Sequence, residues 1–395
     1  MRRIAARYLY TLTSDEPVVN GFVELDIDGT VLRTGVSEDP SLEEEWYDGA
    51  VVPGFVNAHC HVELSYLKGK FRKGSGMAGF IDQINALRDT SSRERKLDSI
   101  REQMNGMWAA GVSAMADISN CDDSFAIKAS HPMYTRTFLE VFGTEPEDCP
   151  SIIAAVRELK AQARSFGLDA APTPHACYTM SPELLTAASV EGLKSGYLSY
   201  HCEESVEEME MIASGSGPMW ENRKAAGMST PPVTGESPLK YFMTRLLAGV
   251  EAPVEGNVLL VHEVCLTPHA ASTAKRILVH PYIAVCPRSN LFIHNALPPI
   301  GIMRESGIPI CVGTDSLSSN DSLDMVAELR CLQDNFSEVS LGEMLVWACR
   351  NGAEFLGKRE ILGSIEPGKR PGIVLIDGLS PEGRLTGASA SRRLV

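Results

Sequence analysis

The sequence lacks the marks of several protein classes. No apolar run approaches the ~20 residues of a membrane-spanning helix. The start of the chain leads into the polar residues Thr11, Thr13 and Ser14 instead of the apolar stretch of a signal peptide. The ten cysteines are scattered singly with no CxxC pair, which is typical of reduced thiols and not of disulfide frameworks or zinc ribbons. We therefore expect a cytoplasmic location.

Basic residues are also in short supply. The 395 residues include 36 Lys and Arg against 51 Asp and Glu, which gives a net charge of −15. This balance argues against nucleic acid and anionic membranes as partners and favours an enzyme with a small-molecule substrate. With 44% hydrophobic residues, the chain has ample material for a packed core. The sequence leaves the number of subunits open, and a homodimer is compatible with it.

From residue 51 onward, short apolar runs alternate with helical patterns. Ser181-Pro182 and Thr267-Pro268 each place a capping residue before a proline, and Ser340 opens a capping box for a helix that reaches about Gly357. The eight apolar runs are residues 51–56, 112–116, 134–141, 168–174, 197–200, 258–261, 283–286 and 308–312. Eight such alternations predict an α/β fold, a parallel (β/α)8 TIM-type barrel, with a doubly wound sheet as the alternative.

The two ends of the chain have a different texture, of short strands and turns. Residues 21–25 alternate in polarity before the turn Asp28-Gly29, and residues 372–376 form another apolar run after the turn at 366–369. There is no internal repeat or long linker. We predict that residues 1–50 and 360–395 form one small composite β-sandwich domain, and that residues 51–359 form the catalytic barrel.

Polar side chains cluster directly after the predicted strands, where a β/α barrel carries its active site. Five of the nine histidines are among them. The residues at these strand ends are His59, His61, Asp117, Glu140, His175, His201, Glu203, Glu204, His262, Arg288, Asn290 and Asp315. Strand ends are a small part of the chain, so this concentration predicts a catalytic centre.

A metal site is the first interpretation of this cluster. His59 and His61 are two residues apart on an extended segment, so both imidazoles point to the same face. With His201 and Asp315 from two other strand ends, they make a set of three histidines and one carboxylate for a divalent metal. Zinc is the first expectation, and Fe²⁺ or Mn²⁺ would accept the same donors. A lysine after the fourth strand could have formed a carbamate between two metals, but His175 stands there, which favours one metal.

Hydrolysis at such a metal also needs groups that carry protons. The metal would lower the pKa of a water nucleophile. Glu204 could protonate a ring nitrogen of the substrate, Asp315 could pass a proton from the water to the leaving group, and His262 could hold the water in line. Glu203 is the competing candidate for the acid.

Segments 53–61, 174–182, 201–204, 286–291 and 313–316 resemble the amidohydrolase superfamily, and more narrowly its aminohydrolase (deaminase) branch. The frame from Glu366 to Asp377 resembles the closing β-domain of that family. The resemblance implies one metal held by His59, His61, His201 and Asp315, with Glu204 and His262 catalytic and His175 in contact with the substrate. It also implies hydrolytic deamination of an adenine-type nucleoside, such as adenosine, methylthioadenosine, S-adenosylhomocysteine or aminodeoxyfutalosine.

Other features bear on the substrate. The loop at residues 68–76 does not clearly supply the tryptophan and carboxylate that nucleoside-binding members use over the sugar. Arg136 and Arg288 could each bind a carboxylate remote from the ring, with Asn290 as a further substrate contact, although ion pairs with Glu140 or Asp117 at the barrel rim are the alternative.

Two other functions are compatible with parts of this pattern. The same metal site could cleave an amide, a carbamate or a chloro-triazine. A metal-stabilised binding protein without activity is the non-enzyme alternative, and the presence of Glu204, His262 and Asp315 together argues against it.

Overall fold

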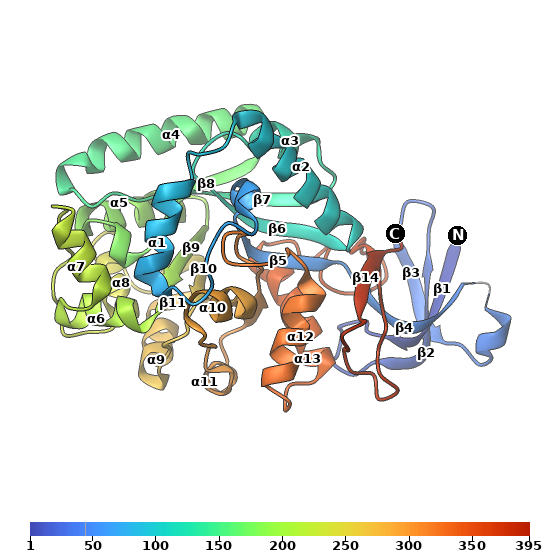
Figure 1. The fold of residues 1–395 in the computed structure, drawn as a ribbon. Coiled ribbons are helices and arrows are strands. Elements are labelled where there is room, and N and C mark those ends of the chain that lie inside the picture. Colours follow the sequence, from blue (N-terminus) through green and yellow to red (C-terminus); the bar gives the residue numbers. More distant parts are fainter. Residues whose placement is uncertain (44) are drawn as a thin grey trace.

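Two four-stranded parallel sheets organise most of the computed structural model, which describes residues 1–43 and 45–395 (Figure 1). The first sheet contains β5 (Phe55–Cys60), β6 (Val112–Ser119), β7 (Tyr134–Val141) and β8 (Asp169–Pro174), and the second contains β9 (Tyr197–Cys202), β10 (Val254–His262), β11 (Leu278–Val285) and β12 (Ile310–Val312). Within each sheet, every strand pairs with its neighbour along the chain. Isolated parallel bridges join the two sheets, Cys60 to Asp315 on one side and Ala176 to His201 on the other.

The strands overlap the eight predicted apolar runs, with one correction at the first. The run at residues 51–56 is divided at Gly54, because its first half ends β4 (Trp46–Pro53) of another sheet and β5 begins one residue later. A Cβ at Gly54 would come within 1.9 Å of the Ser113 hydroxyl and 2.5 Å of the Pro371 carbonyl. This close crossing requires glycine and separates the two strands.

Helices follow most of the strands and begin at the predicted caps. Ser181, Thr267 and Ser340 each accept a hydrogen bond from the backbone amide three residues further on. The helices are α1 (Gly76–Leu87), α2 (Arg93–Ala109), α3 (Phe125–Ser130), α4 (Cys149–Ser165), α5 (Pro182–Leu193), α6 (Val206–Ser214), α7 (Pro218–Ala225), α8 (Pro238–Leu247), α9 (Pro268–Ile277), α10 (Pro287–His294), α11 (Ile300–Ser306), α12 (Met325–Asn335), α13 (Leu341–Leu345) and α14 (Gly352–Phe355). A π-helical turn at Val346–Asn351 connects the last two. Each helix of the described chain is too short or too polar to cross a membrane.

The chain termini form a third, six-stranded sheet beside the other two (Figure 1). Its spatial order is β14 (Ala390–Arg393), β13 (Ile373–Asp377), β4, β1 (Arg2–Leu9), β2 (Val18–Leu25) and β3 (Val31–Val36). The predicted joining of the two termini is therefore present, but the strands make one continuous sheet where we expected a two-sheet sandwich. The reason is that β4 pairs with β1 on one edge and β13 on the other, so the last strands extend the sheet.

Candidate metal centre and active site

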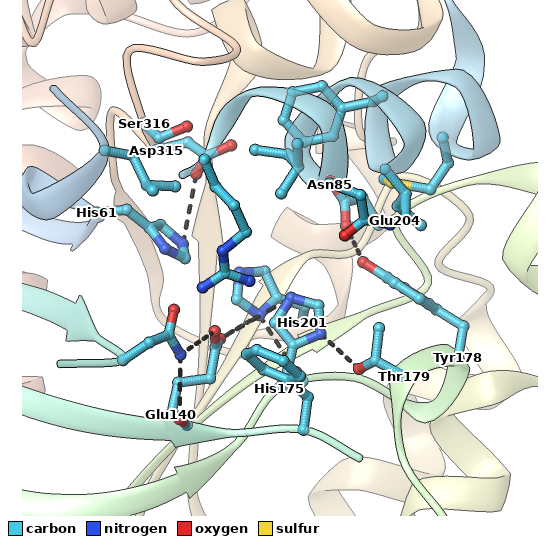
Figure 2. A pocket seen from close by; sticks show the side chains of 18 of the residues that line it. His61, Asn85, Glu140, His175, Tyr178, Thr179, His201, Glu204, Asp315 and Ser316 are labelled. Atoms are coloured by element: carbon cyan, nitrogen blue, oxygen red, sulfur yellow. Dashed lines mark hydrogen bonds and ion pairs between the residues drawn. The ribbon is translucent and has the colours of Figure 1, made fainter. Parts of the chain in front are cut away.

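The carboxyl ends of β5, β9, β10 and β12 meet at one place. Figure 2 shows His61, His201 and Asp315 at this place. His59 lies on β5 and His61 directly follows it, His201 lies on β9, His262 ends β10, and Asp315 comes after β12. All five side chains are buried. The structure therefore brings together the side chains that the sequence placed at separate strand ends.

The backbone is strained at these strand ends. His262 and Asp315 have positive φ angles of 78° and 54°, and Glu203 and Glu263 both have φ of 49°. Residues other than glycine rarely adopt positive φ angles, because this conformation costs of order 1–3 kcal/mol per residue. Such strained residues are concentrated at functional sites. The strain turns the chain sharply after each strand, so that residues next to one another in sequence face different surroundings.

Four side chains offer their donor atoms to a common point. The Nε2 atoms of His59 and His61 are 3.1 Å apart, and they lie 3.8 and 3.6 Å from Asp315 Oδ1. A ligand nitrogen of His201 lies within 4.8 Å of those of the other two histidines. Donors bound about 2.1 Å from one ion lie roughly 3–3.5 Å apart, so this set fits a small divalent metal.

Burial also keeps these imidazoles in the form that binds metals. It lowers the pKa of His59, His61 and His201, so each ring is neutral and retains a free lone pair near pH 7. His201 Nδ1 lies 3.2 Å from the carbonyl oxygen of His175 and must donate to it. That hydrogen bond leaves Nε2 of His201 as the metal-binding nitrogen.

Two serines orient the carboxylate. The hydroxyls of Ser289 and Ser319 donate to Asp315 Oδ2 at 2.6 and 2.8 Å, so Oδ1 is left to face the histidines. Burial alone would raise the pKa of Asp315, but the facing histidines and the Ser289 hydroxyl lower it. Asp315 is therefore ionised and able to bind a cation.

A second cluster adjoins the first. Glu140, His175 and His201 also have ligand atoms within 4.8 Å of one another. Because Nδ1 of His201 is occupied by the His175 carbonyl, His201 is better suited to the first cluster. His175 lines the pocket and its Nδ1 lies 2.7 Å from the Thr179 hydroxyl. Burial lowers the pKa of His175 to about 3, so the ring is neutral.

Glu204 and His262 form a pair beside the metal donors. Glu204 Oε1 lies 3.4 Å from His262 Nε2, and the Tyr178 hydroxyl donates to Glu204 Oε2 at 3.0 Å. Burial raises the pKa of Glu204, and the nearby carboxylates of Asp315 and Glu208 add to the shift. Glu204 is thus protonated over a wide pH range, as a proton donor must be.

Glu203 faces away from this pair. Its Oε1 accepts from the backbone amide of Leu239 at 3.4 Å, in the first turn of α8. Glu204, in contrast, lines the pocket (Figure 2). The geometry therefore favours Glu204 over Glu203 as the acid.

Three expected substrate contacts lie elsewhere. Arg136 is near the amino end of β7, where it pairs with Asp169 at 2.7 Å and stacks 3.6 Å from the centre of the Tyr197 ring. Its predicted contact with substrate is wrong, because the first residue of β7 that lines the pocket is Glu140, four residues further along the strand. The alternative of an ion pair is correct in kind, although the partner is Asp169 instead of Glu140 or Asp117.

Arg288 and Asn290 are also directed away from the pocket. Arg288 donates to the Ser322 hydroxyl at 2.8 Å and lies 3.7 Å from Asp321, in a separate surface cleft. Asn290 is fully buried, with Nδ2 3.2 Å from His262 Nδ1. Both are on α10, whose packing sets their direction, and Asn290 orients His262 where we expected it to bind substrate.

The pocket has a wall that the sequence did not reveal. Helix α1 contributes a row of residues to it, and Arg88 directly follows that helix. The lining from α1 is Met77, Phe80, Ile81, Ile84 and Asn85. Their spacing of three and four residues indicates that they share one face of a helix. The spacing does not indicate which part of the protein that face covers.

Comparison with known proteins identifies the family. A model of the amidohydrolase family matches residues 50–393. This chain belongs to the amidohydrolase family. It is 27% identical over 338 residues to a Helicobacter pylori protein named adenosine deaminase, covering 84% of this chain and 80% of the relative.

Solved structures agree in fold. The chain resembles a Helicobacter pylori aminofutalosine deaminase in complex with methylthio-coformycin, with a TM-score of 0.78 and 22% identity over 98% of this chain and 94% of the other. It also resembles an adenosine deaminase from Xanthomonas campestris with bound zinc, with a TM-score of 0.73 and 20% identity over 98% and 89% of the two chains.

Proposed function

We propose that this amidohydrolase is a metal-dependent deaminase that hydrolyses the amine of an adenine-type nucleoside. The observation that carries the proposal is the pairing of Glu204 with His262 beside the donors of His59, His61, His201 and Asp315, all at one pocket. Relatives and structural neighbours named as adenosine and aminofutalosine deaminases support the same chemistry.

The proposed architecture is a (β/α)8 barrel of residues 51–359 with a small domain of residues 1–50 and 360–395. The neighbour-to-neighbour pairing of eight parallel strands and the two bridges between their sheets support a closed barrel. The composite sheet of the two termini supports a separate small domain. The strand boundary at Gly54 supports a junction a few residues after residue 51.

His59, His61, His201 and Asp315 would hold one divalent metal, with zinc as the first candidate and Fe²⁺ or Mn²⁺ as alternatives. When bound, this metal supplies a Lewis acid that lowers the pKa of the water nucleophile. The zinc in the Xanthomonas campestris neighbour supports this choice.

The protein's own groups then move the protons. Glu204 holds a proton and donates it to the ring nitrogen beside the amine-bearing carbon, while Asp315 accepts a proton from the attacking water and gives it to the departing amine. His262 orients the water, and His175, which follows β8, contacts the ring. The carbon–nitrogen bond breaks and ammonia leaves. The oxygen from water becomes the carbonyl of the product as its second proton returns to Glu204, which restores the acid.

Ammonia release tests the proposal. Protein loaded with zinc should release ammonia from adenosine-type nucleosides, with a blue shift of their ultraviolet absorption. Turnover of amides, carbamates or chloro-triazines with no ammonia from any aminopurine would instead favour the alternative amidohydrolase chemistry.

We also propose a cytoplasmic location and a small-molecule substrate, without nucleic-acid or membrane partners. All ten cysteines are free thiols, which supports a reducing compartment. A homodimer remains a prediction that sedimentation would test.

A further inference from the structure

Tyr178 contacts the carboxyl of Glu204 from the wall of the pocket. Its hydroxyl donates to Glu204 Oε2 at 3.0 Å (Figure 2), and the tyrosine side chain is buried. The other oxygen of the same carboxyl, Oε1, lies 3.4 Å from His262 Nε2. Because the oxygen without a proton is the better acceptor of a protonated carboxyl, this hydrogen bond favours the proton of Glu204 on Oε1, the oxygen beside His262.

The hydroxyl is a lasting donor. Burial raises the pKa of Tyr178, and the neighbouring carboxyls of Glu204 and Glu208 add to the shift, so the phenol keeps its proton near pH 7. The ring of Tyr178 also stands perpendicular to that of His175, with the two centres 5.6 Å apart. The packing of the ring therefore fixes the plane in which the hydroxyl reaches Glu204.

The backbone of Tyr178 is held from two directions. It belongs to the 3-10 helix η4 (Cys177–Thr179), which follows β8. The buried guanidinium of Arg223 on α7 donates from Nη1 to the Tyr178 carbonyl oxygen at 2.8 Å. The carbonyl oxygen of Thr179 accepts from the backbone amide of Gly143, after β7, at 3.0 Å. The tyrosine therefore has little freedom to leave the pocket wall.

Glu208 on α6 connects η4 to the segment that carries Glu204. Its Oε2 accepts from the backbone amide of Glu204 at 2.7 Å, and its Oε1 accepts from the Cys177 thiol at 3.0 Å. Cys177 directly precedes Tyr178, and the Glu208 side chain is fully buried. One carboxyl group thus fixes the separation between the backbone of the acid and the helix of the tyrosine.

We propose that Tyr178 is a positioning residue, which holds the carboxyl of Glu204 so that the proton on Oε1 is presented to the ring nitrogen of the substrate. This inference rests on the proposed deaminase function. Once Oε1 has given its proton to the nitrogen, Glu204 is an anion, and the tyrosine hydroxyl stabilises the charge on Oε2, because hydrogen bonds to a charged acceptor are the stronger ones. The phenol keeps its own proton throughout, and the proton that later returns to Glu204 restores the neutral pair.

Tyr178→Phe tests the inference because it removes the hydroxyl and keeps the ring that packs against His175. With adenosine or methylthioadenosine, whichever is turned over faster, kcat should fall by about 10- to 100-fold. KM should change by less than about threefold, since the hydroxyl acts on the acid and not on the bound substrate. Metal content by elemental analysis and the circular dichroism spectrum should match those of the wild type. An unchanged kcat, or a loss confined to KM, would overturn the inference.

Tyr134→Phe is the matched control. The hydroxyl of Tyr134 also donates to a carboxylate, Asp169 Oδ2 at 2.6 Å, but it does so at the amino end of β7, away from the pocket. This variant should keep the wild-type kcat and KM. If its kcat fell as far as that of Tyr178→Phe, the loss would reflect a general effect of removing a tyrosine hydroxyl, and the role of Tyr178 would be refuted.

A double-mutant cycle shows whether Tyr178 acts through Glu204. In the Glu204→Gln protein there is no proton to present, so the addition of Tyr178→Phe should change kcat by less than about twofold. A direct contact of the hydroxyl with the substrate would instead lower kcat equally in both backgrounds. That result would overturn the positioning role while ammonia release by the wild type still supports the deaminase.

Infrared spectroscopy separates the two proposals if the wild type releases no ammonia. The C=O stretching band of the Glu204 carboxylic acid is the band that Glu204→Gln removes. A hydrogen bond to Oε2 weakens the C=O bond, so this band should move to higher frequency in Tyr178→Phe and stay in place in Tyr134→Phe. A shift supports the hold of Tyr178 on the protonated acid even though the deaminase proposal has failed, and an unmoved band overturns it.

Discussion

Glu204 Oε1 lies 3.4 Å from His262 Nε2. The other ring nitrogen of His262 accepts from the Asn290 amide at 3.2 Å, so the neutral ring carries its proton on Nε2, toward Glu204 and the pocket. Burial lowers the pKa of His262 to about 4 and raises that of Glu204. Two protonated, uncharged donors thus stand side by side next to the metal donors.

Glu204→Gln should abolish proton donation while preserving shape. We expect metal content and fold to be unchanged and kcat to fall by about 10²- to 10⁴-fold, the usual contribution of a positioned acid. Ammonia release and elemental analysis are the measurements. Glu203→Gln is the control, since Glu203 faces α8, and it should keep most of the turnover. The reverse ranking of the two variants would move the acid to Glu203.

His59→Ala and His201→Ala should each lose most of the bound metal and all activity, because each removes one of the four converging donors, three histidines and Asp315. Elemental analysis of purified protein gives the metal content per chain. His269→Ala, at an exposed position on α9, should retain the wild-type content. One metal per chain in both ligand variants would refute the proposed set.

Lys128→Met should destabilise the protein strongly. Lys128 Nζ lies 2.6 Å from Asp117 Oδ2, and both side chains are fully buried. Without the lysine, a carboxylate is left unpaired in the core, which costs about 3–5 kcal/mol in the free energy of unfolding. Denaturant titration measures the loss. Arg101→Met breaks the exposed pair with Asp98 and should cost at most about 1 kcal/mol, so similar losses in the two variants would contradict this ranking.

Glu328 should make stability depend on pH. Burial raises its pKa to about 8, although Asn320 and the Arg288 amide donate to its oxygens. The folded state then keeps a proton that the unfolded chain releases at its ordinary pKa, so the free energy of unfolding falls as pH rises from about 5 to 8, by up to about 1.4 kcal/mol per pH unit. Glu328→Gln should gain stability relative to wild type over this range. A difference that does not change with pH would exclude the effect.

The strand ends were predictable from the sequence because the physics that places them is local. Apolar runs of the length of a buried strand, followed by polar residues, fix where each strand stops, and parallel neighbours bring those ends to one edge. His59, His61, His201 and Asp315 follow from that rule alone. The choice between Glu203 and Glu204 did not, since it depends on the positive φ at Glu203.

The positions of the arginines could not be predicted from the sequence. Arg136 is within a predicted strand, but it lies at the amino end, and only the register with Asp169 reveals that distance from the pocket. The direction of Arg288 is set by its contacts with Ser322 and Asp321, which are remote in sequence. The sequence did not indicate that Arg88 lines the pocket. The surface that α1 covers depends on a long-range contact, in which Glu207 of α6 accepts a hydrogen bond from the backbone amide of Ala78.

The place of β4 between β1 and β13 has a consequence for synthesis on the ribosome. Val52 pairs with Val374, and the whole set of parallel strands is encoded between them. Until the last part of the chain emerges, the open edge of β4 presents unpaired amides and carbonyls next to apolar side chains, which is a template for pairing with other chains. The sheet of the termini can therefore be completed only after β13 has been translated. A nascent or truncated chain that stops before β13 carries an unprotected strand that the folded molecule covers.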